Sequence, residues 1–417
     1  MEMKGKLRNS GVSGFQFQAM STLSAPPSNR SHLQAIAIAM LLAVAGVALG
    51  LAYCRTLETR YIHALAPEFS EEKLQGAVLQ REAFRQPNLL MMYGSSELGK
   101  EMPNNPVQFF KDYPSGFTVF PVGKPGATSL NILQKLAAVG SEVRGRKLVY
   151  SISPGWFLSE DTDVAYYEGN FSTMQAMALI FSGEMSIGLK RDIACRMLEF
   201  PTTTDNTWLL DFAVRRLVGD SRLDRMLYAA VVPLGKLQNA IGRGQDHLEA
   251  ALHILDEDEK LNPTTKSVLR VLNWADILKG AGKAVNAKAV SAKRSEVAKR
   301  KNTADRAKKF RLGLEKSDEW TDFKLLLRTC EELGAKPLFL CMPLEDIRLE
   351  VYGLGKESRL GFVERLQTMA TEFSYPLMLF RDHETDPAFL FDFQDHLSGE
   401  GWLFYNKALD DFFHGRI

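Results

Sequence analysis

The stretch LLMMYGSSELGK, residues 89 to 100, joins an uncharged apolar run to two serines and an acidic residue. An apolar run of this length that ends at glycine is typical of a strand buried on both faces. Serine directly after such a strand usually caps the following helix. The alternative is that one of the two serines is a nucleophile, displayed where the strand ends.

Further short apolar runs follow along the chain. NLLMMY, FTVFPV, KLVYSI and PLFLCM are each bounded by turn residues, and PLMLF at 376–380 is a fifth candidate strand. Helical patterns lie between them, since SLNILQKLAAVG follows Thr128 and ends at Gly140, and WTDFKLLLRTCEELG ends at Gly334. This alternation predicts an α/β fold in which helices cover both faces of a parallel sheet.

Residues 160–315 interrupt the alternation, because they carry long helical patterns and few strand signals. We therefore expect a helical insertion there. Within it, segment 283–311 has eleven Lys and Arg against Glu296 and Asp305. Such a segment could bind an anionic polymer or lipid headgroups. The commoner use of this composition is a solvated helix or a loop.

The N-terminal region contains an apolar run, Ala35 to Tyr53, without a charged residue. That length suffices to span a hydrocarbon core of about 30 Å. Four basic residues and one acidic residue precede the run. The positive-inside rule then places residues 1–32 in the cytoplasm, 33–54 across the membrane and 55–417 outside the cell membrane.

Two other interpretations of this run are weaker. A cleaved signal peptide has a shorter apolar core, and a lipoprotein signal would not carry bulky Tyr53 before Cys54. We therefore expect a single-pass signal anchor. After it, residues 55–86 mix charged and apolar residues as a helical stalk would, and residues 87–417 form the extracytoplasmic domain.

Composition limits the remaining classes of function. The chain has 417 residues, 45% of them hydrophobic, which is enough for one large domain with an insertion. A net charge of +1 gives no argument for nucleic acid as a partner. No CxxC pair or Cys/His spacing occurs, so we expect neither a metal site nor a disulfide framework among Cys54, Cys195, Cys330 and Cys341.

Each predicted strand ends in residues that could take part in chemistry. VGKPGATS follows the second strand, SPGWF the third and MPLE the fourth, while DFQDHLSGEGW at 392–402 places His396 before the last helix. Ligands of open parallel sheets bind beyond the carboxyl ends of the strands. A serine nucleophile needs a base, an orienting acid and amide donors for the oxyanion. All of these types of group occur at the predicted strand ends. This favours the interpretation that one of the two serines after the first strand is a nucleophile.

The order of these motifs resembles that of the SGNH/GDSL hydrolases. YGSSEL, ISPGWF and HLSGEGW, together with the N-terminal anchor, are more specifically similar to the DltD family of D-alanyl transfer proteins. The resemblance covers most of residues 55–417. It implies that Ser96 is the nucleophile, Ser95 a support or cap, Gly126 an oxyanion donor and His396 the general base.

The sequence departs from the hydrolase pattern at two points. The oxyanion asparagine expected after the third strand is absent, so Ser153 or backbone amides near Gly155 are the candidate substitutes. The Asp-x-x-His pattern also fails, because Phe393 lies three residues before the histidine. Asp392 or Asp395 must orient the imidazole instead, and we favour Asp392 because the side chain adjacent to a histidine points elsewhere.

Aromatic residues accompany the same motifs. Trp156 and Phe157 follow the third strand, and Trp402 lies six residues after the histidine. They could form the mouth of a substrate site and keep water from an acyl-enzyme. Ordinary core packing is the alternative.

The resemblance implies acyl transfer outside the membrane without a cofactor. D-alanine would reach the enzyme from a D-alanyl carrier protein, indirectly, through a membrane-bound O-acyltransferase, and pass to an anionic cell-surface polymer such as teichoic acid or another envelope glycan. Two alternatives remain. One is an anchored esterase or thioesterase that uses the same residues with water as acceptor. The other is a non-catalytic scaffold for the acyltransferase, in which Phe393 marks a decayed triad.

Overall fold

The structure is a computed structural model that describes residues 29–257, 260–261, 269–281, 291, 293, 295 and 304–417. The chain divides into two compact units, Met1–Gly50 and Leu51–Ile417. Helix α1 (Asn29–Tyr61) contains a segment, His32–Tyr61, that is long and apolar enough to cross a membrane. This helix near the N-terminus fits a single-pass membrane anchor.

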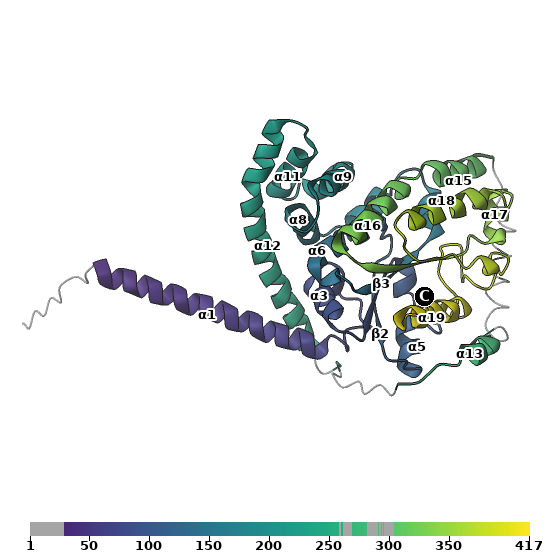
Figure 1. The fold of residues 1–417 in the computed structure, drawn as a ribbon, viewed down its shortest axis with the longest axis horizontal. Coiled ribbons are helices and arrows are strands. Elements are labelled where there is room, and N and C mark those ends of the chain that lie inside the picture. The colour runs from purple at the N-terminus through teal and green to yellow at the C-terminus, as the bar shows by residue number, and fades with distance from the viewer. Residues whose placement is uncertain are drawn as a thin grey trace, which may run out of the picture. The chain divides into compact units, whose positions relative to one another are not determined.

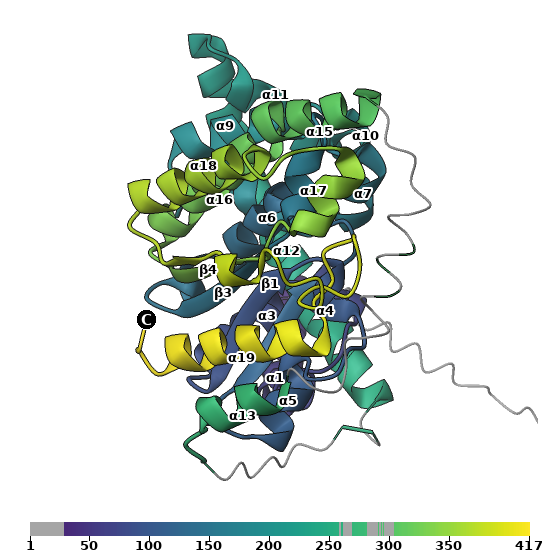
Figure 2. The same cartoon turned by 90° about the vertical axis from the view of Figure 1, so that its right-hand side faces the viewer.

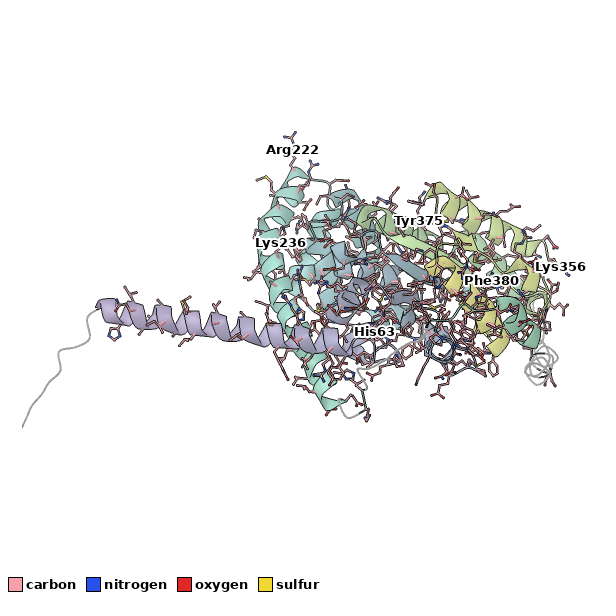
Figure 3. The ribbon with its side chains drawn as sticks, turned by 60° about the horizontal axis from the view of Figure 1, so that its bottom comes forward. His63, Arg222, Lys236, Lys356, Tyr375 and Phe380 are labelled. Carbon is pink, nitrogen blue, oxygen red and sulfur yellow. The ribbon has the colours of Figure 1, made fainter. Side chains whose placement is uncertain are left out.

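Within the described residues, one sheet of five parallel strands forms the centre of the second unit, in the order β2-β1-β3-β4-β5 (Figure 1). The strands are β1 (Leu89–Gly94), β2 (Thr118–Gly123), β3 (Lys147–Ile152), β4 (Lys336–Cys341) and β5 (Leu377–Met378). All five predicted strands are therefore confirmed. Tyr375 and Phe380 flank the short edge strand β5 (Figure 3).

Helices account for most of the remaining described residues. They are α2 (Glu71–Leu74), α3 (Val78–Arg85), α4 (Ser96–Gly99), α5 (Pro106–Asp112), α6 (Ser129–Val139), α7 (Val164–Asn170), α8 (Thr173–Phe181), α9 (Ile187–Met197), α10 (Pro201–Thr204), α11 (Trp208–Val218), α12 (Arg222–Asp256), α13 (Trp274–Ala281), α15 (Ala304–Lys316), α16 (Glu319–Leu333), α17 (Asp346–Tyr352), α18 (Ser358–Glu372) and α19 (Gly399–Phe413). Three short 3₁₀ helices in the described part are η1 (Gly140–Val143), η2 (Pro154–Leu158) and η3 (Arg381–His383).

The sheet is buried on both faces. In β1, Met91 and Tyr93 belong to one hydrophobic core, whereas Leu90 and Met92 belong to another. Successive side chains of a strand point to opposite faces, so the two cores lie on opposite sides of the sheet. Helices α16 and α18 cover one side, and α5, α13 and α19 cover the other (Figure 2). The predicted α/β fold with a parallel sheet between helical layers is confirmed.

Glycine ends both helices that the sequence pattern predicted. Helix α6 begins directly after Thr128, and Gly140 follows it with a φ of 70°. Helix α16 ends before Gly334, which is left-handed with a φ of 70°. Residues with a Cβ rarely adopt this conformation, and glycine therefore terminates these helices without strain.

The predicted stalk at 55–86 is wrong. Leu65, Leu79 and Ala83 in this segment are fully buried, and the segment belongs to the unit that begins at Leu51. Its charges suggested exposure to solvent, but several of them are buried and paired inside the protein, as in the 2.7 Å contact of Glu58 with Nδ1 of His247. The ammonium group of Lys73, for example, donates to the carbonyl oxygens of Ala66 and Glu68, each at 2.7 Å. Burial lowers the pKa of this lysine well below its ordinary value.

The region 160–315, predicted as a helical insertion, lies between β3 and α16, and its described residues contain helices and no strand. The longest is α12, along which Arg222 and Lys236 project (Figure 3). Most of the basic segment 283–311 falls outside the described residues. Lys293, which is described, does not face solvent: it is buried and bonds to Glu345 at 2.6 Å.

The topology brings several loops to one edge of the sheet. Gly94, the last residue of β1, pairs with Gly123, the last residue of β2, and Ile152 of β3 pairs with Cys341 of β4. The chain passes from β1 outward to β2 and then returns to the opposite side of β1 as β3. Such a switch point leaves a crevice at the carboxyl ends of the strands, where ligands of open α/β sheets bind.

Candidate active site

Ser96 stands at the turn that follows β1. Gly94 allows this turn, because a Cβ there would lie 2.2 Å from Oε1 of Glu97. The Glu97 carboxylate folds back and accepts the backbone N–H of Ser95, with distances of 3.0 and 3.1 Å to its two oxygens. Both serines line a cavity of about 410 Å³, but Ser95 is buried, whereas Ser96 is partly exposed and its Oγ lies 3.0 Å from Nε2 of His396. Of the two serines, Ser96 is thus the one presented to a ligand.

His396 joins Ser96 to Asp392. Its Nε2 lies 3.0 Å from Oγ of Ser96, and its Nδ1 lies 2.7 Å from Oδ2 of Asp392. The other carboxylate oxygen of Asp392 accepts the backbone N–H groups of Gln394 and His396. The acid therefore holds both the ring and the backbone of the histidine. An imidazole with its proton on Nδ1 presents the Nε2 lone pair to the serine hydroxyl.

Lys100 adds a positive charge to this pair. Its Nζ lies 2.8 Å from Oδ2 of Asp392 and 3.0 Å from Nδ1 of His396. Burial acts to raise the pKa of Asp392, but hydrogen bonds from His396 and Lys100 outweigh it and hold the pKa well below the ordinary range. Sequence reasoning missed Lys100. Its position four residues after Ser96, at the end of the same short helix, was the available signal.

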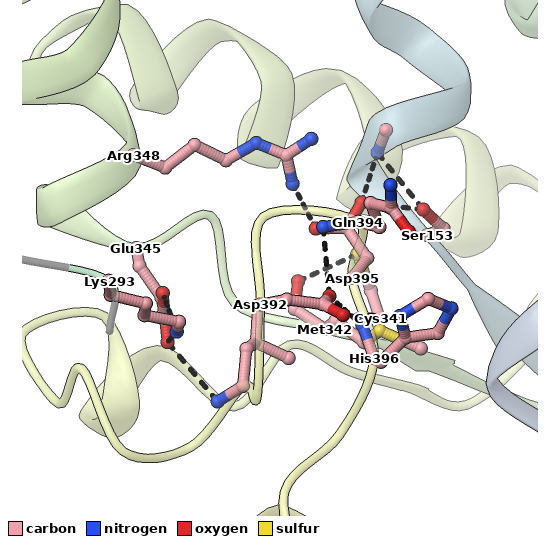
Figure 4. A network of polar contacts seen from close by, with 12 residues as sticks. Ser153, Lys293, Cys341, Met342, Glu345, Arg348, Asp392, Gln394, Asp395 and His396 are labelled. Atoms are coloured by element: carbon pink, nitrogen blue, oxygen red, sulfur yellow. Dashed lines mark hydrogen bonds and ion pairs between the residues drawn. The ribbon is translucent and has the colours of Figure 1, made fainter. Parts of the chain in front are cut away.

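Asp395 faces away from the imidazole and into a buried polar network (Figure 4). Its Oδ2 accepts the Ser153 hydroxyl and the Gly155 N–H, both at 2.6 Å. Its Oδ1 is bound by the guanidinium of Arg348, in an ion pair that is almost fully buried. Of the two candidate acids, the structure brings only Asp392 to the histidine ring. Arg348, which pairs with the other acid, is a further residue that the sequence motifs did not indicate.

The predicted oxyanion donors have different surroundings. Ser153 and Gly155 line the cavity with Ser96, but the Ser153 hydroxyl and the Gly155 N–H both donate to Asp395, so neither is free for an oxyanion, which contradicts the expectation for these two residues. Gly126 lies in the loop after β2 with a φ of 80°, and a Cβ there would lie 2.6 Å from the ring of Tyr166. Its N–H has no acceptor within the described part of the chain. Gly126 therefore remains available as a donor.

The aromatic residues separate into two groups. Trp156 is partly buried and lines the cavity beside Ser96. Phe157 is fully buried against Trp320, with ring centroids 4.3 Å apart. Trp402, a residue of α19, is fully buried in the core that this helix forms with the sheet. The expectation of a mouth residue is therefore wrong for Phe157 and Trp402. Their ring size made them candidates, but both point into a core.

A second buried pair supports the loop that carries Asp392. Nζ of Lys293 lies 2.9 and 2.6 Å from the two oxygens of Glu345, and Oε1 of Glu345 accepts the N–H of Leu390 at 3.2 Å (Figure 4). Leu390 in turn forms an antiparallel bridge with Leu397. The bridge closes the turn in which both Asp392 and His396 lie, and so fixes their separation.

Neither a metal cluster nor a disulfide contributes to this site in the part of the chain that the structure describes. No group of three or more His, Cys, Asp or Glu side chains is arranged there to hold an ion. The cysteine thiols are free, at Cys54, Cys195, Cys330 and Cys341. The chemistry available at the site is that of a serine, an imidazole and a carboxylate, which together suit acyl transfer.

Comparison with known proteins agrees with this arrangement. The family model described as DltD protein matches residues 66–414. Protein DltD of Bacillus subtilis is 23% identical over 359 residues, which cover 84% of this chain and 88% of that protein. Protein DltD of Staphylococcus aureus is 23% identical over 348 residues, covering 82% and 85% of the two chains. Protein DltD of Lacticaseibacillus rhamnosus is also 23% identical, over 365 residues that cover 84% of this chain and 83% of that one. The chain belongs to the DltD protein family.

Proposed function

We propose that this chain is a membrane-anchored serine acyltransferase of the Dlt pathway. It accepts a D-alanyl group on Ser96 and passes it to a hydroxyl group of an anionic cell-surface polymer, such as teichoic acid. The observation that carries the proposal is the 3.0 Å contact between Oγ of Ser96 and Nε2 of His396. A serine becomes nucleophilic when a base within hydrogen-bond reach can take its proton. Membership of the DltD family supports D-alanyl as the acyl group that is transferred.

The first half-reaction forms an ester on the enzyme. Oγ of Ser96 attacks the carbonyl carbon of the D-alanyl donor, and its proton moves to Nε2 of His396. Asp392 stabilises the imidazolium that forms, through its contact of 2.7 Å with Nδ1. The bond between the carbonyl carbon and the leaving heteroatom then breaks, and the leaving group takes the proton from Nε2. The N–H of Gly126 is the candidate donor to the oxyanion.

The second half-reaction reverses these roles. A hydroxyl group of the polymer attacks the acyl carbon and gives its proton to Nε2 of His396. The bond from Oγ of Ser96 to the acyl carbon breaks, and the proton returns to Oγ. Trp156, at the edge of the cavity, would limit the access of water while the acyl-serine waits for its acceptor.

The location follows from the anchor and the charges around it. The positive-inside rule supports a cytoplasmic N-terminus and an extracytoplasmic catalytic unit. A D-alanyl carrier protein in the cytoplasm could then reach Ser96 only indirectly, and a membrane-bound O-acyltransferase is the partner that would pass the acyl group across. The same residues could transfer the acyl group to water, so an esterase is the alternative that a functional assay must separate.

Transfer is tested with the full chain, produced in cells that lack their own copy. Ser96→Ala and His396→Ala should each abolish D-alanyl esters on the envelope polymer, because removing one member of a catalytic unit costs almost as much as removing all. Ser95→Ala is the matched control and should keep activity, since its hydroxyl makes only a long contact of 3.4 Å with the carbonyl oxygen of Lys124.

A serine-reactive fluorophosphonate gives a second measurement on the same variants. It should label the unmodified protein and Ser95→Ala, but not Ser96→Ala. Loss of activity in Ser95→Ala with activity kept in Ser96→Ala would mean that the wrong serine was assigned. Full activity of Ser96→Ala together with absence of labelling would favour the scaffold, and rapid turnover of simple activated esters would favour the esterase.

A further inference from the structure

Glu319, at the start of α16, is a buried acid that the proposed mechanism does not use. The residue is only 2% exposed, yet it lines the same cavity as Ser96. Its Oε1 accepts the N–H of Ser129 at 3.1 Å. Its Oε2 is also buried and has no hydrogen-bond partner within the described residues. A buried carboxylate oxygen without a partner is costly unless a ligand supplies the missing donor.

The positive charges near Glu319 are already engaged. Arg196 bonds to both oxygens of Asp322, at 2.8 and 3.1 Å, and also pairs with Asp318 and Glu199. Burial, and then the charge of Asp322, raise the pKa of Glu319 above its ordinary value. One arginine therefore serves three other carboxylates, and Glu319 is left without a cationic partner in the described part of the chain.

The cavity itself is short of positive charge. Asp161 and Asp163 line it with Glu319, and none of these three acids forms an ion pair with a described residue. Arg348 also lines the cavity, but its guanidinium is held by Asp395. We name Asp161, Asp163 and Glu319 the acidic wall. A cavity with such a wall attracts a cation rather than an anion or a neutral acyl chain.

We propose that the acidic wall binds the primary ammonium group of an aminoacyl substrate, with Glu319 as its direct partner. This inference rests on the proposed function, because the same cavity must present the acyl carbonyl to Ser96. An ammonium group has three N–H donors. One would satisfy Oε2 of Glu319, and the Thr128 hydroxyl, which also lines the cavity, can accept another. A neutral acyl group, such as propionyl, offers no donor and leaves Glu319 unpaired.

The wall would thus select which acyl group reaches Ser96. A positive charge placed beside the buried carboxyl stabilises its ionised form, so the substrate offsets the cost of burying the acid. An acyl group without the ammonium would fit the same space but gain none of this interaction. A site built to pair with a charged group rejects analogues that lack it more strongly than a purely apolar pocket does.

Binding is measured on the full chain in detergent micelles, with Ser96→Ala as background so that no ester is cleaved. The probes are D-alanine methyl ester, a cation at neutral pH, and methyl propionate, its neutral counterpart. Glu319→Gln keeps an oxygen for the Ser129 N–H and should weaken binding of D-alanine methyl ester by about tenfold or more. Binding of methyl propionate should change less than about twofold. Glu331→Gln, on an exposed turn of the same helix, is the matched control and should alter neither.

Three results would overturn the proposal: equal binding of the two esters by the Ser96→Ala protein, equal binding of D-alanine methyl ester with and without Glu319→Gln, or an equal loss for both probes. If Glu319→Gln lowers the melting temperature too far for binding to be measured, the pair Asp161→Asn and Asp163→Asn replaces it. Both residues are exposed, so the fold should persist. Unchanged binding of D-alanine methyl ester by that double variant would contradict the proposal that the acidic wall binds the ammonium group.

The experiment also separates this proposal from the proposed function. With Ser96 intact, acylation of the protein by D-alanyl and propionyl thioesters is followed by mass spectrometry. Glu319→Gln should slow acylation by the D-alanyl thioester and leave acylation by the propionyl thioester unchanged. A protein that is acylated by neither thioester but still binds D-alanine methyl ester through Glu319 would overturn the acyltransferase and retain the acidic wall.

Discussion

Arg348 and Asp395 form an ion pair that is almost fully buried, beside the candidate catalytic histidine but without touching its ring. Asp395 has a φ of 60°, a conformation that few residues other than glycine, asparagine and aspartate adopt. Its carboxylate holds Ser153 and Gly155 as well. The two neighbouring acids, Asp392 and Asp395, therefore make separate contacts: Asp392 with the ring of the candidate catalytic histidine, and Asp395 with a buried arginine.

Substitution of Asp395 should mainly lower stability, whereas substitution of Asp392 should mainly lower acyl transfer. Asp395→Asn keeps the backbone conformation but leaves the Arg348 charge buried and unpaired, which should cost about 3–5 kcal/mol of stability. Asp392→Asn should instead lower acyl transfer by about 10²- to 10⁴-fold with little loss of stability, because it disturbs the tautomer of His396. Thermal melting and D-alanyl transfer, measured on both variants, check this. Comparable transfer by the two variants, corrected for folded protein, would contradict the assignment.

Glu97 should make stability depend on pH. Burial raises its pKa to about 7, although backbone N–H groups of Ser95 and Glu97 act against the shift. The unfolded chain has an ordinary carboxyl with a pKa of about 4.3. Between these two values the folded state holds a proton that the unfolded state releases, so this group lowers stability as pH rises through the window.

Glu97→Gln should remove this loss. The amide keeps an acceptor for the Ser95 N–H and cannot ionise. The variant should therefore be more stable than the unmodified protein above pH 7, by on the order of 3 kcal/mol, and equally stable near pH 4. Melting temperatures of both proteins across this range test the expectation. A constant difference at every pH would show that packing, rather than ionisation, causes the change.

Trp156 and Phe157 offer a matched pair for the choice between transfer and hydrolysis. Trp156→Ala opens the cavity and should raise hydrolysis relative to transfer, because water gains access to the acyl-serine. Phe157→Ala removes a fully buried ring and should cost about 3–5 kcal/mol of stability without changing that ratio. The ratio of free D-alanine to polymer-bound D-alanine is the measurement. An unchanged ratio in Trp156→Ala would remove this residue from the site.

The orientation of the anchor is tested with reporters fused after Ile417. Alkaline phosphatase, which needs an oxidising compartment for its disulfides, should be active there, and a fluorescent reporter that folds only in the cytoplasm should be dark. The reason is the excess of basic residues before the apolar helix. The reverse pattern would place the candidate active site in the cytoplasm and exclude a cell-surface acceptor.

Much of the fold could be predicted from the sequence because its signals are local. The five apolar runs, the leucine spacing of α6 and the glycines at 140 and 334 each report on a few neighbouring residues. The apolar helix near the N-terminus is equally local. The prediction of a stalk at 55–86 was wrong because burial of this segment depends on contacts that are distant in the sequence. Its charges resemble those of an exposed helix, and only tertiary contacts, such as those of Lys73 with backbone carbonyls, make them compatible with burial.

The site shows the same division. The resemblance of its motifs to the SGNH hydrolases and the DltD family nominated Ser96, Gly126 and His396, and the fold brings the serine and the histidine within 3.0 Å across 300 residues of chain. What only the tertiary structure decided is the partner of each polar group: Asp392 for the imidazole, Asp395 for Arg348, and, among the residues that the structure describes, no hydrogen-bond partner for Oε2 of Glu319. The physical reason is that a hydrogen bond forms only when donor and acceptor lie within a few tenths of an ångström of the preferred distance and the donor points at the acceptor. Residue spacing sets which loop a side chain belongs to, and packing sets where it points.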